Sequence, residues 1–296
     1  MSGRARAMLG VLGVVCVSAG AETLYVRPDG TGDYPTIQAA VDAATDGDVI
    51  VLADGVFRGD GNRNIRVDYK NVTITSESGD PTRTVIDCED AASGHCAWMI
   101  RWNPVQVVIE GMSMIHGDGG TSWSGGAASV SESWRVVFRN CIFAGNRAYY
   151  GGAIAGRWCE ISIVSCTFYD NEATASGGGA ALAMDDLGSA ELSHCIVAFG
   201  RAGRAFESLG ATITLECCDV YGNAGGDYAG PITGQLGVNG NISADPLFCD
   251  PARLDLSIAT GSPCAPGGEC GLMGALSIGC GPTPAEATTW GAIQGL

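Results

Sequence analysis

The chain has very little positive charge and few of the side chains that usually carry catalysis. Lys70 is its single lysine, and there are only three histidines. Arginine and lysine together number 16 against 32 acidic residues, so the formal net charge is −16. A surface of this kind repels nucleic acid, anionic membranes and polyanionic sugars. The composition therefore argues against nucleic-acid partners and favours an acidic, solvated surface.

Metal-binding motifs are also missing, although cysteine is common. The 13 cysteines include no Cys-x-x-Cys pair, the spacing used by many structural zinc sites. No Ser-His-Asp arrangement, phosphate-binding loop or dinucleotide fingerprint stands out either. We therefore expect neither a metal nor a cofactor.

Long hydrophobic runs are confined to the N-terminus. Arg4 and Arg6 precede an apolar run from Met8 to Val17, and residues 19–21 form an A-x-A cleavage site. This arrangement is typical of a secretory signal peptide and is too short to span a membrane. We predict a signal peptide at 1–21, no membrane span later in the chain, and a protein that is secreted or held at the cell surface.

A short pattern recurs between Met112 and Asn223. Its copies start at residues 112, 141, 166, 195 and 218, so they lie 23 to 29 residues apart. Most copies place an apolar residue two positions after a cysteine and an asparagine three positions later. The members are Cys141, Cys166, Cys195 and Cys218; Phe143, Phe168, Val197 and Val220; and Asn146, Asn171 and Asn223. A period in this range indicates stacked supersecondary units.

Each unit contains short alternating apolar runs and no apolar stripe at helical spacing, which predicts β-strands. Strands of successive units would pair in parallel about 4.8 Å apart. The cysteines and phenylalanines would then form inward ladders. The asparagines would lie at a turn, where Asn tolerates the left-handed region and its amide can bond the turns above and below. We predict an all-β fold, a single-stranded right-handed parallel β-helix of roughly seven or eight coils.

The ends of this solenoid are predicted to be capped. Thr36 can cap an amphipathic helix whose apolar residues, from Ile37 to Ala44, share one face. Such a helix would cover the open N-terminal end of the solenoid. A segment rich in cysteine would pack over the last coil as a C-terminal cap. The predicted parts after the signal peptide are the N-terminal cap and first coil at 22–58, the coils at 59–235, the C-terminal cap at 236–280 and a tail at 281–296.

Twelve of the 13 cysteines remain once Cys16 is removed with the signal peptide, and an even number suits an oxidising compartment. Closeness in sequence suggests three local disulfides, namely Cys88 with Cys96, Cys249 with Cys264, and Cys270 with Cys280. The ladder cysteines are instead expected to be small inward hydrophobes, because adjacent parallel strands give poor disulfide geometry.

Three stretches resemble known β-helix proteins. Residues 29–44, DGTGDYPTIQAAVDAA, are similar to the N-terminus of pectin methylesterases and resemble the start of pectin-lyase-like proteins. The GGAI and FxxN repeats resemble those of polymorphic outer-membrane proteins and secreted bacterial right-handed β-helix proteins. The DPLF segment at 245–248 and the GSP at 261–263 resemble the closing segment of the latter. The resemblance covers most of residues 23–280 and implies the fold only, because this architecture hosts lyases, hydrolases, esterases, adhesins and inert scaffolds.

Catalytic motifs of these relatives are largely missing. The chain has no DFIFG-type motif of pectin methylesterases and no GHG or RIK-type motif of polygalacturonases. Pectate lyases need carboxylates that hold Ca²⁺ and an arginine or lysine base. The only candidates for such a site are Asp185 and Asp186, followed one coil later by Arg201 and Arg204. A simpler role for the two arginines is to neutralise neighbouring acids such as Glu207.

Aromatic residues concentrate between residues 98 and 158. On the flank of a β-helix they can act as platforms for sugar rings, although packing of loops onto the coil is the simpler explanation. The candidates are Trp123, Trp134, Tyr149, Tyr150 and Trp158. From the sequence we expect a non-catalytic surface or extracellular scaffold or adhesin that contacts a polysaccharide or a cell-surface protein. The alternative is a polysaccharide lyase or glycoside hydrolase acting on the outer flank, with Ca²⁺ required only if it is a lyase.

Overall fold

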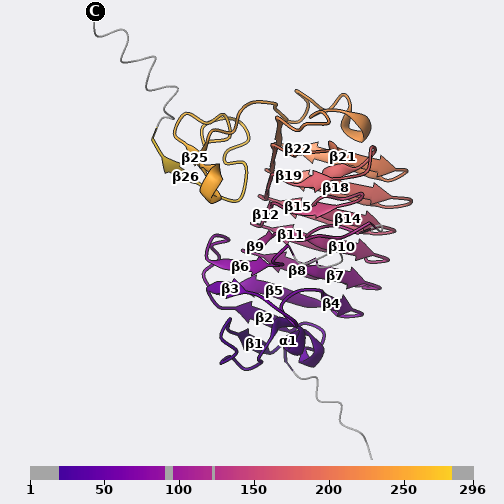
Figure 1. The fold of residues 1–296 in the computed structure, drawn as a ribbon, viewed down its shortest axis with the longest axis vertical. Coiled ribbons are helices and arrows are strands. Elements are labelled where there is room, and N and C mark those ends of the chain that lie inside the picture. Colours follow the sequence, from indigo (N-terminus) through magenta and orange to yellow (C-terminus); the bar gives the residue numbers. More distant parts are fainter. Residues whose placement is uncertain (1–19, 91–95, 122–123, 282–296) are drawn as a thin grey trace, which may run out of the picture.

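The structure, a computed structural model, describes residues 20–90, 96–121 and 124–281. Nearly all of the predicted signal peptide, nearly all of the predicted tail, and Trp123 lie outside these ranges. The described chain winds into a tall parallel β-solenoid whose turns stack along one axis (Figure 1). This confirms the predicted all-β solenoid fold.

Three parallel sheets form the walls of the solenoid. Sheet A contains, in order, β1 (Thr23–Val26), β2 (Val49–Leu52), β5 (Val72–Ser76), β8 (Val107–Glu110), β11 (Val136–Arg139), β15 (Glu160–Val164), β19 (Ser189–Ser193) and β22 (Thr212–Glu216). Sheet B contains β3 (Gly55–Phe57), β6 (Thr84–Asp87), β9 (Ser113–Ile115), β12 (Ile142–Ala144), β16 (Thr167–Tyr169), β20 (Ile196–Ala198) and β23 (Asp219–Tyr221). Sheet C contains β4 (Ile65–Asp68), β7 (Trp98–Arg101), β10 (Ala128–Ser131), β14 (Ile154–Arg157), β18 (Gly179–Asp185) and β21 (Arg204–Leu209).

Six turns, from β2 to β21, contain one strand of each sheet. The sequence predicted roughly seven or eight coils. The difference arises at the ends, where β1 stands alone and β22 and β23 have no following sheet C strand in the described part of the chain. A short extra pair, β13 (Arg147–Ala148) with β17 (Glu172–Ala173), links sheets B and C in two middle turns.

The interior is filled by stacked like residues. Cys141, Cys166, Cys195 and Cys218 are fully buried and unpaired. Two positions further along the chain, Phe143 and Phe168 stack with ring centroids 4.7 Å apart and planes 7° from parallel. Because β12 and β16 pair in register, equivalent side chains of successive turns lie directly above one another.

The asparagines bond the turns on either side of them, but with a different backbone from the one expected. The Asn146 amide nitrogen donates to the Met114 carbonyl at 3.0 Å and to Asn171 Oδ1 at 3.1 Å. The Asn171 amide donates to the Phe143 carbonyl at 2.9 Å. The left-handed conformation belongs to the residue before each asparagine, as in Gly145 and Asp170, with φ of 64° and 55°. The bend is therefore made one residue earlier, which leaves the asparagine side chain directed inward.

At the N-terminal end, α1 (Ile37–Ala43) covers the open edge of sheet C. Thr36 accepts a hydrogen bond from the Ala39 amide at 3.2 Å, and Ile37, Ala40 and Val41 are buried. The side chain of Gln38 bonds the backbone of Arg66 in β4 on both its N–H and its carbonyl. The helix thus occupies the place of the sheet C strand that the first turn lacks.

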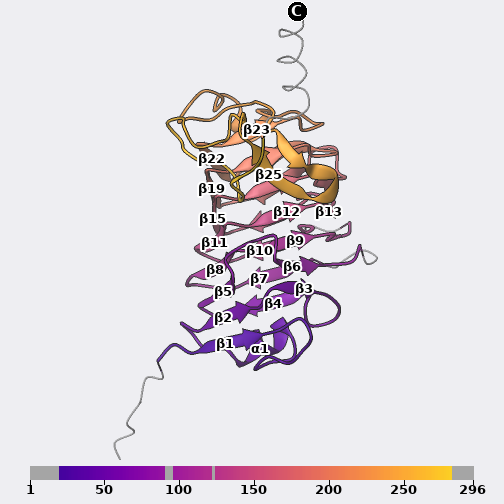
Figure 2. The ribbon, with the colours of Figure 1, turned by 90° about the vertical axis from the view of Figure 1, so that its left-hand side faces the viewer.

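The C-terminal region differs from the predicted cap. Residues 228–242, with the 3₁₀ helix η1 (Gly230–Ile232), close the last turn: Ile232 is buried, and Asn241 accepts from the Cys218 amide. Residues 245–280, here called the C-terminal segment, fold back along the outer face of sheet B (Figures 1 and 2). This segment contains β24 (Phe248–Asp250), η2 (Pro251–Arg253), β25 (Asp255–Ala259) and β26 (Ile278–Cys280).

The disulfides differ from those suggested by closeness in sequence. Cys217 pairs with Cys270 and Cys249 with Cys280, so the first bridge ties the C-terminal segment to the last turn. Cys88, Cys96 and Cys264 are free and buried. The suggested local pairs were therefore wrong. Cys270 instead meets Cys217 because the C-terminal segment folds back on the solenoid, and Cys280 meets Cys249 because β26 and β24 both lie beside β25.

Candidate functional site

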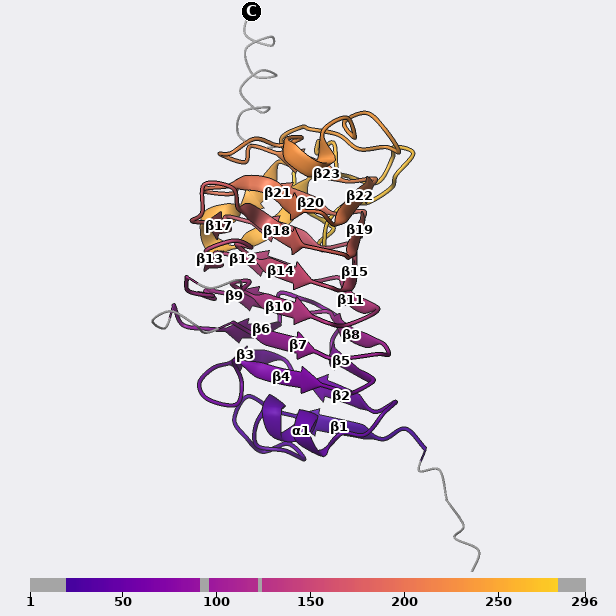
Figure 3. The ribbon, with the colours of Figure 1, turned by 90° about the vertical axis from the view of Figure 1, so that its right-hand side faces the viewer.

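The outer face of sheet C is a broad face that the C-terminal segment does not cover (Figure 3). Most of its strands end in a left-handed residue, which turns the chain toward sheet A. These corner residues are Tyr69, Trp102, Glu132, Trp158 and Asp186, with φ between 48° and 55°. Backbone bonds hold successive corners together, for example Trp102 N–H to the Ser131 carbonyl at 3.1 Å. Equivalent corner side chains of neighbouring turns therefore lie about 4.8 Å apart along the solenoid.

Four aromatic side chains surround one cavity at this corner. The cavity, here called the aromatic pocket, has a volume of about 510 Å³ and is lined by Tyr69, Trp102, Pro104, Glu132, Trp134 and Trp158. Tyr69 and Trp134 are 66% and 49% exposed, and Trp102 and Trp158 are also exposed. Tyr69 and Trp102 stack with centroids 5.5 Å apart. Large rings so open to solvent on one corner are typical of a binding surface.

A column of charged residues runs beside the aromatic corner. The strand pairing places Asp68, Arg101, Ser131, Arg157 and Asp185 in register on five successive turns. Arg101 donates two hydrogen bonds to Asp68, at 3.2 and 2.9 Å. The guanidinium of Arg157 lies 3.5 Å from Asp185 and 3.7 Å from Asp186, and its Nε is buried without a hydrogen-bond partner. Arg157 is therefore held more loosely than Arg101.

Each arginine also covers a tryptophan of the corner. The guanidinium carbon of Arg101 lies 4.6 Å from the ring centroid of Trp102, and that of Arg157 lies 4.2 Å from Trp158. Cation–π contacts of this kind fix the orientation of both partners.

A second cavity lies on the outer face of sheet C itself. This arginine groove, of about 480 Å³, is bordered by Arg101, Ser129, Ser131, Glu132, Arg157 and Trp158 among others. It shares Glu132 and Trp158 with the aromatic pocket. The two cavities thus form one continuous surface with polar and aromatic parts, the composition expected of a ligand site.

The structure brings together two of the five predicted aromatic candidates. Trp134 and Trp158 line the aromatic pocket. Tyr149 and Tyr150 pack edge-to-face with each other before β14 begins, whereas Trp158 follows the end of β14. The two tyrosines therefore lie at the opposite end of this strand from the pocket.

The predicted catalytic residues do not form one cluster. Arg201 pairs with Asp170 at 3.2 Å, and Arg204 pairs with Glu207 at 2.9 Å. Burial raises the pKa of Asp170, which the Arg201 charge partly offsets. The arginine beside Asp185 and Asp186 is instead Arg157. Asp185 and Asp186 do not meet Arg201 and Arg204 because the strands of sheet C align Arg157 with Asp185.

Sequence reasoning missed Tyr69, Trp102, Arg101, Arg157 and Glu132. A usable signal existed, because the same dipeptide, Arg-Trp, occurs at 101–102 and at 157–158. Both copies end a sheet C strand and begin the following corner. Aligning the repeats on the sheet C strands, and not on the cysteines that precede the sheet B strands, would have placed these residues side by side.

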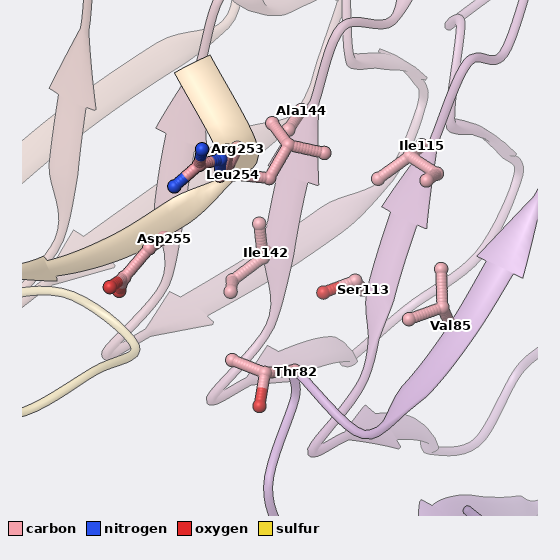
Figure 4. Close-up of a pocket in the computed structure, with 9 residues that line it drawn as sticks. All are labelled: Thr82, Val85, Ser113, Ile115, Ile142, Ala144, Arg253, Leu254 and Asp255. Carbon is pink, nitrogen blue, oxygen red and sulfur yellow. The ribbon is translucent and has the colours of Figure 1, made fainter. Parts of the chain in front are cut away.

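A further cavity lies between sheet B and the C-terminal segment (Figure 4). Its volume is about 380 Å³. Val85, Ser113, Ile115, Ile142 and Ala144 rise from three strands of sheet B, with Arg253, Leu254 and Asp255 beside them. This cavity continues the apolar face that the C-terminal segment covers. Its polar side chains already bond within the chain, as Ser113 does with the Pro81 carbonyl and Arg253 with Asp250.

Within the described ranges, no group of three or more His, Cys, Asp or Glu side chains is arranged to hold a metal ion. No helix in the same residues is long and apolar enough to cross a membrane.

Comparison with known proteins identifies the fold family. Among solved structures, the chain is similar to pectate lyase Pel9A, with 11% identity over 88% of this chain and 97% of that one, and a TM-score of 0.37. It is also similar to a pectin methylesterase from Aspergillus niger, with 12% identity over 81% of this chain and 95% of that one, and a TM-score of 0.30. No curated protein sequence matches it. The model of the right-handed β-helix region matches residues 62–241, and the chain belongs to this family.

Proposed function

We propose that this chain is an exported, non-catalytic glycan-binding protein that uses the aromatic pocket and the arginine groove together. The observation that carries the proposal is the exposure of Tyr69, Trp102, Trp134 and Trp158 around one cavity. Flat aromatic faces pack against sugar rings, while Ser129, Ser131 and the arginines offer hydrogen bonds to hydroxyl groups. The sequence features typical of a signal peptide and the two disulfides support export.

The protonation and the neighbours of Arg157 favour binding over catalysis. An arginine side chain keeps its proton in proteins, and here it faces two carboxylates. Such a group can donate hydrogen bonds to the oxygens of a ligand but is poorly suited to remove a proton. The alternative, a polysaccharide lyase or hydrolase on this face, would have to use Asp185, Asp186 and Arg157.

The test is a binding screen of neutral and charged oligosaccharides against the purified protein, followed by calorimetry. We expect Trp134→Ala to weaken binding about two- to tenfold, because one ring contact is lost. Tyr149→Ala is the matched control, since Tyr149 is similarly exposed but lies away from the pocket. Equal losses in both variants, or no binding by the wild type, would contradict the proposal.

The same samples separate binding from catalysis. Unsaturated products and reducing ends are followed with and without Ca²⁺. Calcium-dependent product release that disappears in Arg157→Gln would replace the binding proposal with the lyase alternative. An unchanged polymer, together with saturable binding, supports the non-catalytic function.

A further inference from the structure

We propose that the aromatic pocket binds an alkylated ammonium group, so that the natural ligand is zwitterionic, with its cation among the rings and its anion at Arg157. This inference rests on the proposed glycan-binding function and narrows it to glycans that carry such a substituent. Trimethylammonium beside a phosphate, as in phosphocholine, is the simplest chemistry of this class.

The ring arrangement is the first argument. The faces of tryptophan and tyrosine rings carry negative potential, and cages of several rings are a recurring means of binding quaternary ammonium groups. Here three tryptophans and one tyrosine line a single cavity of about 510 Å³. Trp102 and Trp158 each have a guanidinium over one face, and Tyr69 stacks on Trp102 with one of its faces. In the described residues no guanidinium lies over Trp134 or Tyr69, so the faces left for an external cation are those of Trp134 and the second face of Tyr69.

The second argument is the charge of Glu132. This exposed residue lines both cavities. The arginines on the turns before and after it form ion pairs with other acids, Arg101 with Asp68 and Arg157 with Asp185 and Asp186. Glu132 itself forms no ion pair in the part of the chain that the structure covers. A carboxylate among aromatic rings without a cation of its own favours a positively charged ligand.

The third argument concerns the anion. The Arg157 side chain is 42% exposed, and its ion pairs with Asp185 and Asp186 are long, at 3.5 and 3.7 Å. Its Nε is buried toward Asp185, so a ligand can meet only the rest of the guanidinium. Because Arg157 lines the arginine groove next to Glu132 and Trp158, a phosphate or carboxylate can bind there while a cation occupies the pocket. The corner thus presents a negative carboxylate and a positive guanidinium on neighbouring turns, which complements a zwitterion.

The net charge of the chain agrees with this chemistry. At −16, the protein repels a polyanion but not a zwitterion, whose charges cancel. A zwitterionic substituent therefore reconciles the exposed arginine with the acidic surface.

The experiment is calorimetric titration of the full chain with choline, phosphocholine and the uncharged tert-butyl analogue of choline. We expect phosphocholine to bind most tightly, choline more weakly, and the uncharged analogue weakest. Trp134→Ala and Glu132→Gln should each weaken choline binding about two- to fivefold. Arg157→Gln should reduce phosphocholine binding to the level of choline, while Tyr149→Ala should leave all three affinities unchanged.

Equal binding of choline and its uncharged analogue would overturn the inference, because the pocket would then recognise apolar volume alone. Neutral oligosaccharides that bind through Trp134 while phosphocholine does not would also overturn it, yet leave the glycan-binding function intact. Phosphocholine binding with no affinity for any glycan would support the ammonium site and contradict the glycan function. Binding to phosphatidylcholine vesicles, in place of phosphocholine-substituted saccharides, would do the same and identify a lipid headgroup as the source.

Discussion

The outer faces of sheets B and C differ in what contacts them, although both sheets present alternating side chains to the same core. On sheet B, Ile142, Ala144, Ile196 and Ala198 point outward and are at most 4% exposed, because the C-terminal segment packs on them. On sheet C the outward residues include Arg101, Ser131 and Arg157, and this face stays open. In a solenoid the inward positions specify the fold, whereas the outward positions decide which wall is covered by the chain itself and which is left for a ligand.

The hydrogen bonds on the two faces also differ in where their donors come from. The C-terminal segment donates from its backbone to sheet B and to the corner beside it. Ala275 N–H donates to Thr167 Oγ1 in β16 at 2.9 Å, and Gly274 N–H donates to the carbonyl of His194, between β19 and β20, at 2.8 Å. On sheet C the polar side chains bond one another along the solenoid axis, as Arg101 does with Asp68. The sheet B face therefore depends on the C-terminal segment for its stability, and the sheet C face does not.

The largest expected effect on stability comes from introducing one aspartate on each of the two faces and comparing the two variants. Ile196→Asp buries a carboxylate beneath the C-terminal segment and should lower the free energy of unfolding by about 3–5 kcal/mol. Ser131→Asp, placed between two arginines on the open face, should change it by less than about 0.5 kcal/mol. Urea denaturation of both variants checks the difference. Similar losses would show that the sheet C face is covered as well.

Next in size is the removal of the bridge between the C-terminal segment and the last turn. The double variant Cys217→Ser and Cys270→Ser opens a loop of 53 residues and should lower stability by about 2–4 kcal/mol. Hydrogen exchange should speed up in β12, β16 and β20 but not in β10 or β14. The variant Cys249→Ser and Cys280→Ser, which opens a loop within the segment, is the control. Uniform acceleration in all three sheets would contradict the division between the two faces.

A pH-dependent effect is expected from Asp219, the first residue of β23 in sheet B, whose side chain contacts the C-terminal segment. It accepts hydrogen bonds from the Cys264 thiol at 3.2 Å and the Ala244 amide at 3.0 Å. Burial raises the pKa of Asp219 to about 6. The folded chain therefore holds a proton that the unfolded chain has already released, and the stability of the protein falls as the pH rises from about 4 to about 6.

Asp219→Asn removes this titration while keeping a group that can accept from Ala244. At pH 7 the variant should be more stable than the wild type by about 2–3 kcal/mol, and the difference should vanish below about pH 4. Unfolding measured across this range provides the test. A constant difference at all pH values would mean that the carboxyl of Asp219 is not protonated in the folded state.

The smallest effect concerns the end of sheet C that α1 covers. Lys70 Nζ donates to the carbonyl of Val41, to that of Asp42 at 2.9 Å and to that of Ala44 at 2.8 Å, at the C-terminus of the helix. Lys70→Met keeps the apolar stem but loses these bonds, so stability should fall by about 0.3–1 kcal/mol. The local opening of α1, followed by hydrogen exchange, should increase more than that of any sheet. No change in α1 would show that solvent replaces the lysine without cost.

The local features of this chain could be predicted from its sequence, whereas the long-range contacts could not. The inward ladders at Cys141, Phe143 and Asn146 follow from a pattern within about 25 residues, and such a pattern dictates both strand and register. The corner aromatics could be recognised only in part. Trp134 and Trp158 stand out by composition, whereas Tyr69 precedes Trp134 by 65 residues and Trp158 by 89. Pairings such as Cys217 with Cys270 depend on where a whole segment folds back.

The amino-acid sequence by itself determined the solenoid, because the alternation of apolar residues and the repeat of 23 to 29 residues are local and recur in successive turns. Only the tertiary structure decided which wall the C-terminal segment covers, which cysteines pair and which arginine meets Asp185. The Ala275 contact to Thr167, for example, joins residues 108 positions apart. No periodicity encodes a contact of that separation; it depends on the complementarity of two finished surfaces, which exist only after the coils have stacked.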